Sequence, residues 1–127
     1  MASELRVNTL KDASGNNSVG MEYVAEGTAK SWMNLNGSSF GLRDSFNVAS
    51  ATDVSTGKYT ANFTSSMNTA NYAVLTNGSR ANDATVTARQ SELATGSYTP
   101  QCFEADTPSS AFEDSDSVYT AVIGDLA

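Results

Sequence analysis

The sequence predicts an all-β fold, either an antiparallel β-sandwich or a jelly-roll-like domain. Three observations favour this class. Apolar and polar residues alternate with a period of two, turn residues recur at roughly 8 to 12-residue spacing, and no segment of helical length keeps a 3.6-residue period. The 127 residues correspond to about one domain. We expect an extended N-terminal arm over residues 1–27 and a β-sandwich over residues 28–127.

The expected arm begins with a short strand. Residues 3–11 alternate so that Leu5, Val7 and Thr9 share one face. The stretch DASGNNS that follows is rich in turn-forming residues. Residues 19–27 are loosely patterned and contain two glycines. We therefore expect this part to be extended rather than to belong to the core.

The clearest alternation starts at Ala29. Ser31, Met33 and Leu35 share one face with it, and the opposite face carries Lys30, Trp32, Asn34 and Asn36. The Asn-Gly pair at 36–37 predicts a hairpin turn. A second strand is expected over residues 40–43, a third within 44–52, and a fourth over 58–63, after a loop that ends in glycine.

Further strands are expected over residues 72–76, 83–90, 99–104 and 117–125. The pair Asn77-Gly78 is expected to close the first of these as a turn. The acidic segment around Pro108 is expected to be a loop. In the last strand both alternating faces are partly apolar, which indicates a central position in a sheet.

Composition disfavours several classes of partner. The net charge of −7 would repel a phosphate backbone, so no nucleic acid is expected. The basic residues do not cluster as they do at an anionic membrane surface. No apolar run approaches the roughly 20 residues that cross a bilayer, and the N-terminus lacks the pattern of a secretory signal. We therefore expect no membrane insertion.

Catalytic and metal-binding residues are scarce. The chain has no histidine, the commonest general base and nitrogen ligand of zinc, and its single cysteine, Cys102, is expected to be a buried thiol. We predict a protein that is not an enzyme and has no cofactor. Paired carboxylates remain the one catalytic option. The candidates are Glu104, Asp106, Glu113, Asp114 and Asp116, and a solvated loop is the favoured interpretation of them. The Asp114 and Asp116 carboxylates could also bind Ca²⁺.

Large apolar side chains are few. Leucine, isoleucine, valine and phenylalanine fall below the roughly 20% at which a chain becomes too poor in them to fold alone. We expect that one chain cannot close its own interior and that copies must share it. Trp32 stands on a polar face, and three settings would explain it: a subunit interface, packing under a loop of the same chain, or a sugar-stacking platform. The first is favoured, and the interface would comprise Lys30, Trp32, Asn34 and Asn36.

Parts of the chain resemble a known family. SELRVNTLKDASGN at residues 3–16, the stretch from Gly27 to Val74, and VYTAVIGD at residues 118–125 resemble segments of tail fibres and related virion structural proteins of tailed bacteriophages, especially of marine and freshwater bacteria. The ordered motifs are Ala-Lys-x-Trp, Asn-Gly, Asp-Ser-Phe-Asn-Val and Tyr-Thr-x-Asn-Phe. The resemblance covers about three fifths of the chain. Residues 77–117 do not resemble these segments.

The resemblance implies a virion component, commonly a homotrimer, with a β-rich tip that contacts the host surface and no catalytic residues. We expect a short tail fibre or fibre tip on the phage particle. Its arm would bind other virion proteins, and loops within residues 77–117 would contact a host surface glycan or protein. The alternatives are a capsid decoration or spike protein, and a polysaccharide depolymerase. The receptor-binding candidates are Tyr98, Gln101, Phe103, Asp106, Phe112 and Asp114, with Tyr119 as a further aromatic beside the same region.

Overall fold

The structure is built almost entirely from antiparallel strands. The computed structural model of the chain describes residues 3–80, 86–104 and 111–127. The elements in this part are β1 (Thr9–Lys11), β2 (Ser18–Gly20), α1 (Met21–Gly27), β3 (Ala29–Asn36), β4 (Gly41–Phe46), β5 (Val48–Ser55), β6 (Lys58–Phe63), β7 (Ala73–Ser79), β8 (Val86–Ala94), β9 (Ser97–Glu104) and β10 (Ser117–Ile123). The prediction of an all-β fold is confirmed.

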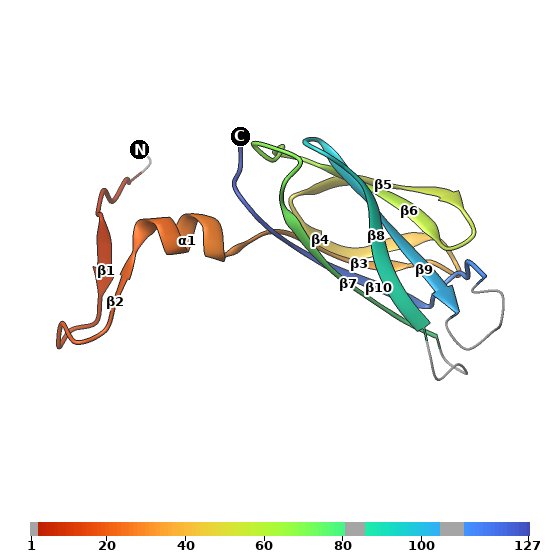
Figure 1. Ribbon diagram of the computed structural model, residues 1–127, viewed down its shortest axis with the longest axis horizontal. Helices are drawn as coiled ribbons and strands as arrows, with labels where there is room; N and C mark the ends of the chain where they lie inside the picture. Colours follow the sequence, from red (N-terminus) through yellow and green to blue (C-terminus); the bar gives the residue numbers. More distant parts are fainter. Residues whose placement is uncertain (1–2, 81–85, 105–110) are drawn as a thin grey trace.

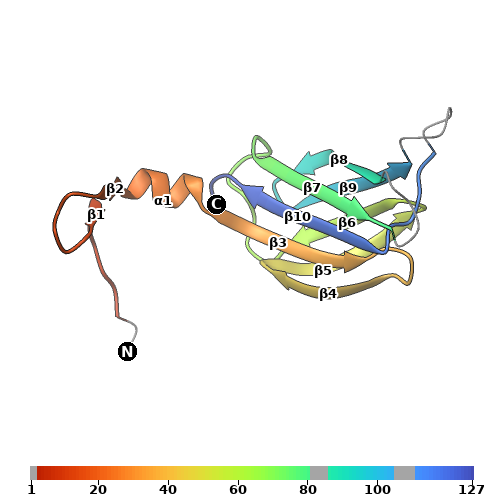
Figure 2. The same ribbon diagram turned by 90° about the horizontal axis from the view of Figure 1, so that it is seen from below.

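Two four-stranded sheets form the body of the molecule (Figures 1 and 2). One has the strand order β4-β3-β10-β7 and the other β5-β6-β9-β8. The chain passes between the sheets after β4, β6, β7 and β9, so each sheet mixes early and late strands. The last strand, β10, lies between β3 and β7, which confirms its predicted central position.

The N-terminal segment and the turns of the β3–β4 and β5–β6 hairpins lie at opposite ends of the two sheets (Figure 1). Residues 9–20 form a small hairpin of β1 and β2, followed by helix α1. None of the residues of α1 is buried. The sequence does not predict this helix, because seven residues are too few to show a helical period. The C-terminus lies at the same end as α1, and the β3–β4 and β5–β6 turns lie at the far end (Figures 1 and 2).

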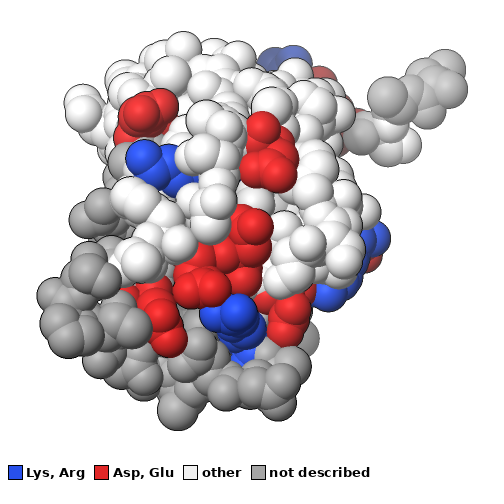
Figure 3. Space-filling model, turned by 90° about the vertical axis from the view of Figure 1, so that its right-hand side faces the viewer, with Lys and Arg blue, Asp and Glu red and all other residues white. Residues whose placement is uncertain are grey.

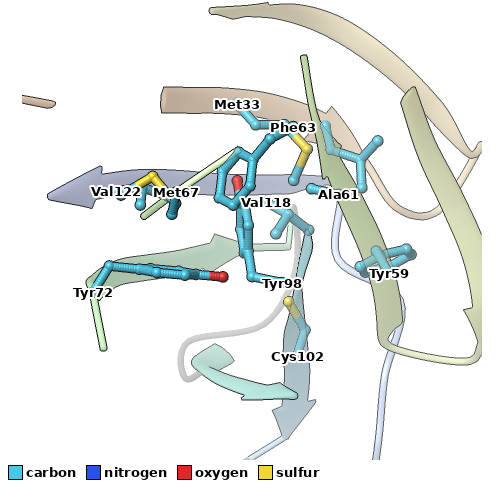
Figure 4. Close-up of a cluster of buried hydrophobic side chains, with 11 residues drawn as sticks. Met33, Tyr59, Ala61, Phe63, Met67, Tyr72, Tyr98, Cys102, Val118 and Val122 are labelled. Carbon is cyan, nitrogen blue, oxygen red and sulfur yellow. The ribbon is translucent and has the colours of Figure 1, made fainter. Parts of the chain in front are cut away.

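The core fills the space between the two sheets. Figure 4 shows the ring of Phe63 beside those of Tyr98 and Tyr72, with centroid distances of 5.3 and 5.7 Å. The Tyr98 hydroxyl lies 2.6 Å from that of Thr120, which joins β9 to β10 across the sandwich. The buried hydrophobic residues are Met33, Leu35, Tyr59, Ala61, Phe63, Met67, Tyr72, Tyr98, Cys102, Val118 and Val122.

A single chain therefore closes its own core, contrary to our expectation. The estimate of apolar bulk counted only leucine, isoleucine, valine and phenylalanine. Three tyrosines and two methionines supply much of the missing volume. Each buried tyrosine hydroxyl has a hydrogen-bond partner, so these rings enter the core without an unpaired polar group. Any association between copies must rest on the surface instead.

Two predicted strand boundaries are wrong. The expected strand within residues 44–52 is divided at Asn47, whose φ of 55° sends β4 and β5 into different sheets. The expected turn at Asn77-Gly78 is a regular part of β7, in register with Tyr119 and Val118 of β10. An Asn-Gly pair only permits a turn, and here the ladder with a central strand is formed instead.

Within residues 77–117, strands are expected at 83–90 and 99–104, and the structure has β8 (Val86–Ala94) and β9 (Ser97–Glu104) there. β8 and β9 make up half of the second sheet, and β9 is buried from Tyr98 to Cys102. Pro100 lies within β9 although proline cannot donate to a ladder. No residue of β6 is paired with Pro100 in the ladder between β6 and β9. The missing N–H of the proline therefore leaves no β6 residue without its ladder partner.

Candidate functional site

The clearest candidate surface is the outer face of the sheet β4-β3-β10-β7, which points away from the second sheet. Along β3 the side chains of Ser31, Met33 and Leu35 are buried in the sandwich. The period of two therefore turns the alternate residues outward. These are Lys30, Trp32, Asn34 and Asn36, the four residues predicted to share one face. Their common placement agrees with the alternation in the sequence.

Register places large apolar residues from three strands in one row across this face. Trp32 of β3 is opposite Phe46 of β4 on one side and Ala121 of β10 on the other. Ala121 is in turn opposite Leu75 of β7. Trp32, Phe46 and Leu75 are 39%, 55% and 57% exposed. We call Phe46, Trp32, Ala121 and Leu75 the apolar row.

A second row beside it combines one aromatic ring with amides. Tyr119 of β10 is 44% exposed and lies opposite Asn34 of β3 and Asn77 of β7. Directly opposed residues on neighbouring strands have Cβ atoms about 5 Å apart. Tyr119 is therefore flanked by an amide side chain on each side. Between Tyr119, Asn77, Leu75 and Ala121 lies an open hollow of about 430 Å³.

Few charges lie on the outer face. In the described part of the chain it carries Lys30, Arg43 and Asp44, two cations and one carboxylate, while the whole chain has a net charge of −7. Lys30 Nζ donates to the carbonyl oxygen of Thr28 at 2.6 Å. The Arg43 guanidinium donates to Ser117 Oγ at 2.8 Å and to the Asp116 carbonyl oxygen at 2.7 Å. The face is thus close to neutral on an acidic protein.

Trp32 is only partly covered by its own chain. The alternative that a loop of the same chain buries its indole is not borne out, because 39% of the residue stays exposed. Asn34 and Asn36 already have local partners. Asn34 Oδ1 accepts from Arg43 at 3.4 Å, and Asn36 Oδ1 accepts from the Ser39 backbone N–H at 3.1 Å. Sequence reasoning missed Phe46 and Leu75 as neighbours of Trp32, because their proximity depends on cross-strand register.

The end of the sandwich far from α1 is acidic. Figure 3 looks onto this end and shows Asp and Glu side chains gathered near its centre, with basic side chains among them. The segment before β10 contacts the β3–β4 and β5–β6 turns here. Asp114 Oδ1 accepts from the Gly57 N–H at 2.7 Å and from the Tyr59 hydroxyl at 2.9 Å. The carbonyl oxygen of Ser115 accepts from the N–H groups of Gly37 and Ser38.

The predicted receptor-binding residues do not form one accessible loop. Tyr98 and Gln101 lie in β9 and are 0% and 6% exposed, so their assignment to a binding loop is wrong. Phe103 and Phe112 are half-buried and face each other through an isolated bridge. Asp114 is partly buried, and its carboxylate braces the β5–β6 turn. Asp106 lies outside the described residues.

Several acidic side chains at this end hold neighbouring segments together through hydrogen bonds and an ion pair. Asp116 Oδ1 accepts from Ser38 Oγ at 2.8 Å, and Glu113 forms an ion pair with Arg80 at 2.6 Å. Among the described residues, no group of three or more acidic or cysteine side chains is placed to hold a metal ion. The thiol of Cys102 is buried, and burial raises its pKa. A thiolate nucleophile is therefore disfavoured at this position.

Comparison with known proteins adds no relative. The chain matches no protein-family model, and neither curated proteins nor solved structures give a significant match. Over the described residues, no helix has the length and apolar character needed to cross a membrane.

Proposed function

We propose that this chain is a structural protein of a bacteriophage virion, a short tail fibre or fibre tip that attaches the particle to the host surface by binding. The resemblance of residues 3–16, 27–74 and 118–125 to fibre segments supports this. The structural observation that carries the proposal is that the two ends of the molecule differ. An exposed N-terminal segment extends from one end of the sandwich, and the β3–β4 and β5–β6 turns lie at the opposite end (Figure 1). This arrangement suits an anchor at one end and a contact surface farther out.

The proposed oligomer is a homotrimer in which the β4–β3 half of the outer face contacts neighbouring copies. Exposed Trp32 and Phe46 would supply apolar area, and aromatic residues of this kind are enriched at protein interfaces. The face carries a single described carboxylate, Asp44, so two acidic chains could approach there with little repulsion. The number of copies comes from the family resemblance. Three linked binding surfaces would raise the effective affinity of a weak single site.

Immunogold electron microscopy of the virion tests this proposal. Antibodies against the folded chain should label the tail of intact particles, and the purified protein should compete with particles for adsorption to host cells. Label confined to the capsid would replace the tail-fibre assignment with capsid decoration. Particles without any label would overturn a virion role altogether.

We propose that the protein binds the host surface without cleaving its polysaccharides, and a separate assay tests this. Purified protein incubated with capsular polysaccharide or lipopolysaccharide of the host should release no new reducing ends. Release of reducing ends that is lost in Glu113→Gln, with the circular dichroism of the variant unchanged, would establish a depolymerase. A dinitrosalicylate assay with a heat-inactivated sample as control separates these results.

A further inference from the structure

The hollow on the β10–β7 half of the outer face has the features of a small binding site. It is lined by Leu75, Thr76, Asn77, Tyr119, Thr120 and Ala121, three consecutive residues from each of two paired strands. Thr120 is buried on the core side of the sheet, where it contacts Tyr98, and Thr76 is directly opposite it. The outward side chains of Leu75, Asn77, Tyr119 and Ala121 therefore form the walls. The volume of about 430 Å³ falls in the range of ligand pockets.

The small side chain of Ala121 leaves this space open. Its cross-strand partners are Trp32 on β3 and Leu75 on β7, and both have much larger side chains. The exposed ring of Tyr119 stands two residues away on the same strand and the same face. A flat ligand placed over Ala121 would have an aromatic ring on one side, an aliphatic side chain on another, and the Asn77 amide within the same hollow.

We propose that this hollow binds a neutral pyranose unit of a surface glycan. A sugar ring has an apolar face of C–H bonds that can lie against the Tyr119 ring, and hydroxyl groups that can bond to the Asn77 amide. An exposed aromatic residue beside an amide provides both kinds of contact. The lining contains no charged side chain, which matches a ligand without charge.

Charge argues against an acidic sugar. The described cations on this face are Lys30 and Arg43, and both already donate within the chain: Lys30 to the Thr28 carbonyl oxygen, and Arg43 to Ser117 and the Asp116 carbonyl oxygen. A carboxylate on a uronic acid would find no free cation in the lining. The net charge of −7 would also oppose the approach of a polyanion. The hollow therefore favours hexoses without carboxylate groups.

This inference rests on the proposed function and gives its binding surface a location. The β4–β3 half of the outer face is left for contacts between copies, and the β10–β7 half remains open to the ligand. Recognition would then occur on the sheet and not within the loops expected from the sequence. The two proposals are separable, because glycan binding is measured on the purified chain and virion location on the particle.

A ¹H–¹⁵N NMR titration of the full chain tests the inference. The probes are gluco-, galacto- and manno-oligosaccharides, with an oligogalacturonate as the acidic comparison. At least one neutral probe should shift the signals of residues 75–77 and 119–121 with a dissociation constant on the order of millimolar. Tyr119→Ala should weaken that binding about tenfold or more. Ala121→Leu should weaken it similarly, because it fills the hollow without removing a ligand contact.

Tyr23→Ala serves as the matched control. Tyr23 is also an exposed tyrosine, but it lies on α1 and away from the sheet, so this variant should bind as the unaltered chain does. Binding that survives Tyr119→Ala, or that prefers the oligogalacturonate, would overturn the inference. So would loss of self-association in Tyr119→Ala together with no response to any neutral probe, since the hollow would then belong to the contact between copies. Binding of the chain to whole host cells without a neutral glycan response would retain the proposed function and reject this site.

Discussion

The side chain of Asn47 and the backbone of Ser65 exchange two hydrogen bonds. Asn47 Nδ2 donates to the carbonyl oxygen of Ser65 at 3.0 Å, and the Ser65 N–H donates to Asn47 Oδ1 at 2.7 Å. The same Nδ2 group also donates to the Lys30 carbonyl oxygen. Asn47 has a φ of 55°, a left-handed conformation that asparagine tolerates better than most residues. One side chain therefore secures the corner where the chain leaves one sheet for the other.

We expect Asn47→Ala to destabilise the sandwich by about 2 to 4 kcal/mol, from lost hydrogen bonds and a strained backbone. Asn47→Gly should cost about 1 kcal/mol less, because glycine accepts the positive φ while losing the same bonds. Urea denaturation followed by circular dichroism measures both. Equal stability of the two variants would mean that backbone strain contributes nothing at this corner.

Asn47 also marks a limit of prediction from sequence. The alternation through residues 44–52 continues across it, so a period of two predicts one unbroken strand. Nothing local distinguishes an asparagine in a strand from one that takes a positive φ. The choice depends on Lys30 and Ser65, whose proximity is a result of the fold. By contrast, β3 was predicted correctly because one of its faces is buried, and burial of one face enforces strict alternation.

Buried polar residues also limit what can be predicted from the sequence. Thr99 and Gln101 of β9 are almost fully buried, and Thr99 Oγ1 lies 3.2 Å from Thr60 Oγ1. With Pro100 between them, this stretch has neither the composition nor the period of a central strand. The apolar row could be predicted only in part. Trp32 was conspicuous in the sequence, but Leu75 joins it through β10, which is distant in the chain.

Gly57 should be the least replaceable glycine of the sandwich. Its φ is 68°, and an added Cβ would collide with the Cys102 carbonyl oxygen and lie 2.8 Å from the Glu113 nitrogen. We expect Gly57→Ala to lower the free energy of unfolding by about 3 kcal/mol or more. Gly15→Ala is the control, since Gly15 also has a positive φ but open space around it. That variant should leave the unfolding of the sandwich unchanged, and a similar loss in both would contradict the steric argument.

Stability should fall at alkaline pH because of buried tyrosines. Burial raises the pKa of Tyr72 to about 12, and burial, together with the Asp114 carboxylate, raises that of Tyr59. A tyrosine in the unfolded chain titrates near 10. The folded pKa is the higher one, so the stabilising contribution is complete below about pH 10 and is lost as pH rises through the folded value. Tyr72→Phe should make the fall of unfolding free energy with pH less steep between pH 10 and 12, by at most about 1.4 kcal/mol per pH unit. Urea titrations at several pH values measure this slope, and an unchanged slope would rule out Tyr72 as a contributor.

Association between copies should depend on the apolar row. We expect Trp32→Ala to weaken the proposed trimer by about 2 kcal/mol per contact, as loss of a central aromatic anchor does at other interfaces. Phe46→Ser should act in the same direction, because Phe46 is opposite Trp32 and more exposed. Both residues lie outside the buried core, so the far-ultraviolet circular dichroism should change little. Sedimentation velocity at micromolar concentration reports the oligomer.

The control for this prediction is Val54→Ala. Val54 is exposed at the edge of the second sheet, so its truncation removes apolar surface from a place with no proposed partner. This variant should sediment as the unaltered chain does. A chain that is monomeric before any substitution would remove the trimer, and dissociation in all three variants would point to general loss of apolar surface. Because the core closes within one chain, a monomer would remain folded, and the outer face would then be available over its whole width to other partners.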